Sequence, residues 1–247
     1  MRLDQFLTEK GYAETRTKAK NLIESGSVTV NGKLILKPAF DVCEDDEISS
    51  RTDLVCPYVS RGGLKLEGAL REFGIDVTGA ICLDIGASSG GFTDCLLKHG
   101  AKKVYAVDSG SGQLHKSLLK DDRVISLENV NARYLSEKEI PEKADVTVMD
   151  VSFISQTKLY PAIIPLMKDN GVLVSLIKPQ FEVGRSGVGK GGIVRDEKKR
   201  KEAVDNVIAF ASSFGLKNIK TVLSPIKGGD GNTEFLAHFV LDSERRQ

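Results

Sequence analysis

The sequence predicts an α/β protein in two parts: a small α+β module and a larger doubly wound domain with a mixed seven-stranded sheet. Two observations predict the larger domain. Apolar segments alternate with amphipathic helical segments from residue 61 onward, which is typical of strands and helices wound on a central sheet. The last two apolar segments have no helix between them, so they are expected to form an antiparallel pair at one sheet edge.

The first 50 residues predict two helices and a hairpin. Apolar residues with helical spacing within 3–7 predict a first helix. Thr15 is a candidate N-cap of a second helix over 16–24, and Gly26 is the signal that ends this helix. Alternating apolar residues on both sides of Asn31-Gly32 predict a hairpin over 28–36.

The larger domain follows a linker over 51–60, which contains Pro57. Its elements are read from apolar segments of strand length and from longer segments with helical periodicity. Strands are expected at 80–85, 103–107, 124–127, 146–150, 172–177, 217–223 and 235–241, and helices at 64–73, 91–99, 155–167 and 197–214.

The composition excludes several protein classes. The 247 residues are 40% hydrophobic with a net charge of +1, so neither disorder nor a global attraction to nucleic acid is indicated. The apolar run at 171–177 is far shorter than the ~20 residues of a membrane span, and the N-terminus has no signal-peptide core. The four cysteines form no C-x-x-C pair, which argues against a zinc site. A reduced cytoplasmic protein without a metal or a membrane partner is expected.

A glycine-rich turn follows the first strand of the larger domain. Glycines in residues 84–91 let a ligand approach the backbone, and the next helix offers free N–H groups at its start. The spacing D-x-G-x-x-x-G misses the dinucleotide fingerprint G-x-G-x-x-G and suits a nucleoside without a pyrophosphate, such as S-adenosylmethionine. Asp108, at the end of the second strand, can accept both ribose hydroxyls, and Asn131 can bind the adenine edge. A generic strand–helix turn is the alternative.

Charged residues occur at the ends of other strands. Asp150 ends the fourth strand and Lys178 the fifth, so both are expected at the carboxyl edge of the sheet beside the nucleotide. A lysine after a long apolar strand is costly unless paired, which makes Asp150 its natural partner. Lys65, before the first strand, and Glu234, at the start of the last, complete a Lys-Asp-Lys-Glu set. Taken singly, each is more often a surface charge.

The N-terminal module has a basic cluster. Residues 1–40 hold seven Lys and Arg against four acids. Arg16, Lys18 and Lys20 start the second helix and Lys33 lies on the hairpin, an arrangement that can track RNA phosphates. A solvated helix face is the alternative.

These motifs together resemble a known family. Residues 61–241 resemble the FtsJ-like ribosomal RNA 2′-O-methyltransferases, and residues 1–50 resemble an S4-type RNA-binding domain. The linker VSRGGLKL at 59–66 and the strand ends DVSFIS at 150–155 and KPQFE at 178–182 resemble the TlyA family, whose members are called hemolysin A or ribosomal RNA 2′-O-methyltransferases.

The resemblance implies an S4-like domain over 1–50, a linker over 51–60 and a Rossmann-like methyltransferase domain over 61–247. It implies methyl transfer from S-adenosylmethionine to a ribose 2′-hydroxyl of ribosomal RNA, in assembled ribosomal subunits. Related enzymes carry Asp where this chain has Asn131.

The implied site residues fall into three sets. Lys178 is expected to orient or deprotonate the hydroxyl. The catalytic set is Lys65, Asp150, Lys178 and Glu234; the cofactor set is Asp84, Gly86, Ala87, Ser88, Gly90, Gly91, Phe92, Thr93, Asp108, Asn131 and Asp150; the RNA-binding set is Arg2, Arg16, Lys18, Lys20, Lys33 and Arg61.

Three other functions remain as alternatives. A nicotinamide-dependent oxidoreductase shares the fold class but requires the missing fingerprint. A cytolysin would need an amphipathic or membrane-spanning segment, which the sequence does not show. An RNA-binding protein without methyltransferase activity would not need the Lys-Asp-Lys-Glu set. Phe153 and Phe181, which flank that set, are interpreted as core residues rather than base-stacking residues.

Overall fold

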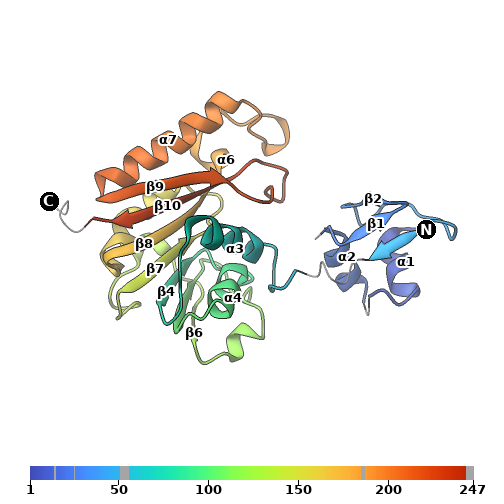
Figure 1. Cartoon of the computed structure of the whole chain (residues 1–247), viewed down its shortest axis with the longest axis horizontal. Coiled ribbons are helices and arrows are strands. Elements are labelled where there is room, and N and C mark those ends of the chain that lie inside the picture. The colour runs from blue at the N-terminus through green and yellow to red at the C-terminus, as the bar shows by residue number, and fades with distance from the viewer. Residues whose placement is uncertain (14, 25, 51–55, 185–186, 243–247) are drawn as a thin grey trace. The chain divides into compact units, whose positions relative to one another are not determined.

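The computed structural model describes residues 1–13, 15–24, 26–50, 56–184 and 187–242. The chain forms two compact units, Met1–Pro57 and Tyr58–Gln247 (Figure 1). Each has its own hydrophobic core, so each is described by itself.

The first unit packs two helices against a small sheet through a core that includes Leu3, Leu7 and Ile23. The predicted hairpin is present, with Asn31 and Gly32 at positive φ. A third strand, which the sequence did not predict, pairs antiparallel with the first. The elements are α1 (Leu3–Glu9), α2 (Arg16–Glu24), β1 (Val28–Val30), β2 (Lys33–Leu34) and β3 (Ile48–Ser50), with sheet order β2-β1-β3.

The second unit is built on a mixed seven-stranded sheet, as predicted. Five neighbouring strands, in the order β6-β5-β4-β7-β8, are parallel to one another. Strand β10 is antiparallel to both of its neighbours, β8 and β9. The order is β6-β5-β4-β7-β8-β10-β9, and the strands are β4 (Ile81–Ile85), β5 (Lys103–Val107), β6 (Val124–Leu127), β7 (Ala144–Met149), β8 (Met167–Ile177), β9 (Leu216–Leu223) and β10 (Phe235–Leu241).

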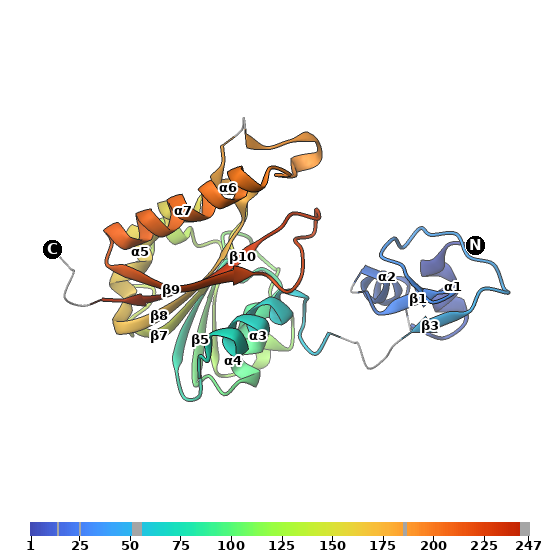
Figure 2. The ribbon, with the colours of Figure 1, turned by 45° about the horizontal axis from the view of Figure 1, so that its top comes forward.

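Helices cover both faces of this sheet (Figure 2). On one face lie α3 (Gly62–Phe73) and α4 (Gly91–Lys98), and on the other lie α5 (Tyr160–Ile163) and α7 (Glu197–Ser213). A short α6 (Pro179–Glu182) follows β8. No helix in the described ranges combines the length and apolar character needed to cross a bilayer.

The helix predicted over 155–167 is wrong. The segment forms three short turns instead, of which α5 is the middle one, and Met167 already belongs to β8. Pro161 and Pro165 explain the difference, because proline has no N–H to donate and its ring clashes with the preceding helical turn.

The chain reverses its direction of travel across the sheet at β4. From β4 the chain moves outward through β5 to β6, then returns to place β7 on the other side of β4. Open α/β sheets bind ligands outside the carboxyl ends of the strands at such a switch point. The topology therefore places a binding site where β4 and β7 end.

Because its core is self-contained, residues 58–247 alone are expected to fold. The shortened chain should melt in one cooperative thermal transition with native-like circular dichroism. Binding of a hydrophobic dye by the unheated protein, together with loss of the cooperative transition, would contradict this.

Candidate active site

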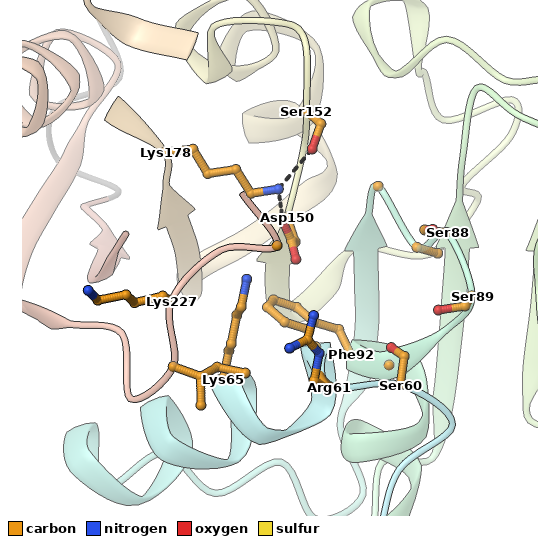
Figure 3. A pocket seen from close by; sticks show the side chains of 16 residues that line it. Ser60, Arg61, Lys65, Ser88, Ser89, Phe92, Asp150, Ser152, Lys178 and Lys227 are labelled. Carbon is orange, nitrogen blue, oxygen red and sulfur yellow. Dashed lines mark hydrogen bonds and ion pairs between the residues drawn. The ribbon is translucent and has the colours of Figure 1, made fainter. Parts of the chain in front are cut away.

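Two cavities lie at the switch point. The smaller, of about 310 Å³, is lined by the start of α3, the turn after β4, and residues that follow β7 and β8 (Figure 3). The larger, of about 690 Å³, is lined by residues that follow β4, β5, β6 and β7. Gly86, Ser88, Asp150 and Ser152 line both cavities, so the two meet at the ends of β4 and β7.

The turn after β4 needs a glycine at residue 86. Gly86 has a φ of +85°, which side chains rarely allow, and a Cβ there would lie 2.4 Å from the carbonyl oxygen of Asp150. The Asp150 amide donates to the Ile85 carbonyl at 3.0 Å, which holds the two strand ends together. Only a residue without a side chain fits between them.

Asp84, in β4, lies buried next to this turn. Its side chain is fully buried, and the Thr93 hydroxyl donates to its Oδ2 at 2.7 Å. Burial raises the pKa of Asp84 to about 7, because a charged carboxylate loses its hydration there. Among the described residues its Oδ1 has no hydrogen-bond partner. Asp84, Gly90 and Thr93 are thus buried behind the turn, whereas the rest of the predicted cofactor set lines the two cavities.

Asp108 and Asn131 both line the larger cavity, from the ends of neighbouring strands. The Asp108 carboxylate accepts the Ser88 amide at 2.8 Å and the Gly110 amide at 2.7 Å. Each of its oxygens keeps a second lone pair, so the carboxylate can still accept hydroxyl donors from a ligand. The Asn131 side chain accepts the Arg133 amide at 3.1 Å, which leaves its NH₂ group as a donor.

Lys178 forms the ion pair expected from the sequence. Its Nζ lies 2.5 Å from Asp150 Oδ1 and donates to the Ser152 hydroxyl at 2.9 Å (Figure 3). The lysine and aspartate side chains are only 11% and 20% exposed, so the pair is screened little by water. Ser152 is a partner that the sequence did not predict.

Lys65 forms a second, more deeply buried pair with Glu234. Lys65 Nζ lies 2.6 Å from Glu234 Oε2, and the two side chains are 10% and 3% exposed. The antiparallel direction of β10 explains the position of Glu234. Phe235 lies opposite Ile177 in the sheet, so the residues beyond each, Glu234 and Lys178, reach the same edge. The four charged residues are therefore arranged as two pairs.

Comparison with known proteins identifies both units. The model of the FtsJ-like methyltransferase family matches residues 58–240, and that of the S4 domain matches residues 1–48. The chain belongs to the FtsJ-like methyltransferase family.

Several relatives align with this chain over almost its whole length. Hemolysin A of Brachyspira hyodysenteriae is 48% identical over 98% of this chain and 100% of its own length. The 16S/23S rRNA (cytidine-2′-O)-methyltransferase TlyA of Mycobacterium tuberculosis is 41% identical over 99% of this chain and 91% of its own. A solved structure from Streptococcus thermophilus, named as a hemolysin, superimposes with a TM-score of 0.78 at 42% identity, covering 98% of this chain and 89% of that one.

In the S4 domain, two predicted RNA-binding arginines share a buried carboxylate. Arg2 Nε lies 2.9 Å from Asp4 Oδ1, Arg16 Nε lies 3.0 Å from Asp4 Oδ2, and Asp4 is fully buried. These arginines hold the pKa of Asp4 well below its usual range. Lys18, Lys20 and Lys33 are exposed. Arg61 lies in the methyltransferase domain instead and lines the smaller cavity (Figure 3).

The interpretation of Phe153 as a core residue is wrong. Phe153 is 91% exposed, has a φ of +64° and lines the larger cavity. Its ring contacts Phe181, whose centroid lies 5.3 Å away. The loop that carries Phe153 is fixed by Glu182, whose carboxylate accepts the Ser155 hydroxyl at 2.6 Å and the Gln156 amide at 3.0 Å.

Asp84→Asn is expected to change how stability depends on pH. The folded-state pKa of Asp84 is raised to about 7, whereas the unfolded value is about 4. The contribution of Asp84 to the free energy of unfolding therefore decreases as pH rises from about 4 to 7. Asparagine does not ionise and can still accept the Thr93 hydroxyl. The variant should therefore gain thermal stability over the native chain at pH 8 and show a clearly smaller gain at pH 5, where only part of this loss has occurred.

The control for this experiment is Asp122→Asn at an exposed aspartate. An equal difference between Asp84→Asn and the native chain at both pH values would contradict the pKa assignment.

Proposed function

We propose that this protein transfers a methyl group from S-adenosylmethionine to a ribose 2′-hydroxyl of ribosomal RNA in the cytoplasm. The observation that carries the proposal is the Lys178 ammonium, which Asp150 and Ser152 hold where the two cavities meet. Lys178 lines the smaller cavity, and its partners Asp150 and Ser152 also line the larger, nucleoside-sized one. The ammonium is therefore suited to meet a substrate hydroxyl beside a bound nucleoside. The name of the TlyA relative supports ribosomal RNA as the substrate.

The larger cavity fits the cofactor. Asp108 offers carboxylate lone pairs for the two ribose hydroxyls, and the Asn131 amide can bind the adenine edge. Gly86 leaves room for a ligand against the backbone, and the amino-acid part of the cofactor can reach the turn before α4. When bound, S-adenosylmethionine supplies a methyl group attached to a positively charged sulfur.

The paired charges suit the acceptor hydroxyl. Lys178 donates one N–H to the Ser152 hydroxyl and forms an ion pair with Asp150, so an N–H of the ammonium can bind the hydroxyl oxygen and orient it. To remove the hydroxyl proton, Lys178 must first lose one of its own protons, and its ion pair with Asp150 opposes that loss because it stabilises the ammonium. Lys65 lines the same cavity, and its pairing with Glu234 leaves this second cation neutralised.

RNA binding is assigned to the S4 domain, within the proposed division into residues 1–50, a linker over 51–60 and a methyltransferase domain over 61–247. Asp4 orients the guanidinium groups of Arg2 and Arg16, and each retains N–H donors for an RNA phosphate. Lys18, Lys20 and Lys33 add positive charge. Arg61 would meet RNA that enters the smaller cavity.

Asp108→Ala is expected to weaken S-adenosylmethionine binding by roughly tenfold or more, because two charge-assisted hydrogen bonds are worth about 1.5–3 kcal/mol. Isothermal titration calorimetry measures the change. Asp121→Ala, which removes an aspartate bound by Arg123, is the matched control. Unchanged affinity in Asp108→Ala would overturn the ribose assignment.

Lys178→Ala is expected to abolish methyl transfer while cofactor affinity stays within about twofold, because a positioned acid–base group contributes typically 10²–10⁴-fold to the rate. The measurement is single-turnover transfer of a radiolabelled methyl group from S-adenosylmethionine to purified ribosomal subunits. Lys178→Arg should also fail, because a guanidinium does not release its proton.

Lys220→Ala is the control, because Lys220 is an exposed lysine whose ion pair with Glu72 lies outside both cavities. Loss of less than about tenfold in Lys178→Ala, below the usual range for such a group, would mean that the hydroxyl is activated elsewhere. No transfer by the native chain to any subunit would contradict the proposed function itself.

A further inference from the structure

One wall of the larger cavity is a loop over residues 109–114, between β5 and the strand β6 that follows it. Gly110 and Gln113 from this loop line the cavity beside Asp108. The loop has no regular secondary structure of its own, so its shape depends on the groups that accept its backbone N–H donors.

Two carboxylates supply those acceptors. Asp108 accepts the Gly110 amide at the start of the loop. Glu128, just after β6, accepts the amides of Gly112 at 2.9 Å, Gln113 at 3.0 Å and Leu114 at 3.3 Å. These backbone hydrogen bonds hold the pKa of Glu128 below its ordinary value, so the side chain stays ionised at neutral pH. A carboxylate that binds three consecutive amides fixes the path of the loop.

Gln113 is the side chain that this arrangement presents to the cavity. Its Oε1 accepts the Ser88 hydroxyl at 3.2 Å, which ties the loop to the turn after β4. A Cβ placed on Gly110 would lie 2.0 Å from Gln113 Nε2, so the amide lies directly over Gly110. Within the described residues, Gln113 Nε2 has no hydrogen-bond acceptor, so it can donate to a ligand beside Asp108.

We propose that Gln113 contacts the nucleoside of the cofactor and that Glu128 is the positioning residue that holds it there. This inference rests on the proposed function, in which the larger cavity takes S-adenosylmethionine. Gln113 reaches the ligand, whereas Glu128 acts only through the loop. Among the described residues, neither side chain forms a hydrogen bond or ion pair with Lys178, Asp150 or Ser152, so both should affect binding rather than the chemical step.

The test compares cofactor affinity and steady-state kinetics in the full-length protein. Gln113→Ala and Glu128→Ala should each raise the dissociation constant and KM for S-adenosylmethionine by about tenfold, the effect of one or two lost hydrogen bonds. The value of kcat should stay within about twofold, since the transition-state contacts are kept. Glu128→Gln should fall between Glu128→Ala and the native chain, because the amide oxygen can still accept the Gln113 and Leu114 amides.

A double variant and a control isolate the mechanism. If Glu128 acts through Gln113, Gln113→Ala combined with Glu128→Ala should weaken binding little more than either change alone. Glu139→Ala is the matched control, because Glu139 also accepts a backbone amide, that of Ser136, but lines neither cavity. Fully additive effects would overturn the positioning role of Glu128.

A cofactor fragment tests which half of the ligand the loop contacts. 5′-Methylthioadenosine carries the nucleoside without the amino-acid part, so the variants should weaken its binding by the same factor as that of S-adenosylmethionine. Native affinity for this fragment in both variants would overturn the inference. Absence of S-adenosylmethionine binding by the native chain would instead contradict the proposed function, so the two failures are distinguishable.

Discussion

The site depends on a contact between two pieces of backbone. Gly86 and Asp150 end neighbouring parallel strands, and the space between them admits no side chain. Because the two backbones are this close, Gly86 and Asp150 both lie in the walls of both cavities. A displacement of either strand end would separate the Lys178 ion pair from the turn that faces the larger cavity. The geometry proposed for the reaction therefore depends on a glycine at residue 86, because any Cβ there would push the two strand ends apart.

Charge is distributed around that contact in matched pairs. Lys178 with Asp150 and Lys65 with Glu234 each sum to zero, so these two lysines add no net charge to the small cavity, which Arg61 and Lys227 also line. Removal of one member of a buried pair leaves an uncompensated charge, which is strongly destabilising. The four residues therefore matter to the stability of the fold as well as to the proposed chemistry.

Residues placed by the strands could be predicted from the sequence, and residues placed by loops could not. Asp150 and Lys178 end adjacent parallel strands, so the order of the sheet brings them together and their pairing follows. Ser152 and Glu128 depend on the paths of irregular segments, for which periodicity gives no signal. Phe153 was misread because an aromatic residue beside an apolar segment usually packs inward, whereas its positive φ turns this one outward. The prolines within 155–167 are a sequence signal against one long helix, because each removes an N–H donor and its ring clashes with the preceding helical turn.

The antiparallel strand β10 also has a consequence for the order in which the protein is made. All residues that line the larger cavity lie before residue 160, whereas the partner of Lys65 is Glu234, 169 positions further along the chain. During synthesis from the N-terminus, every residue that lines the larger cavity is therefore made before the counter-ion of Lys65. The ion pair of Lys65 with Glu234 forms only when the final strand enters the sheet between β8 and β9. Because residues of β10 share one hydrophobic core with residues of β4 and β5, loss of the final strand would open that core and also remove the counter-ion of Lys65.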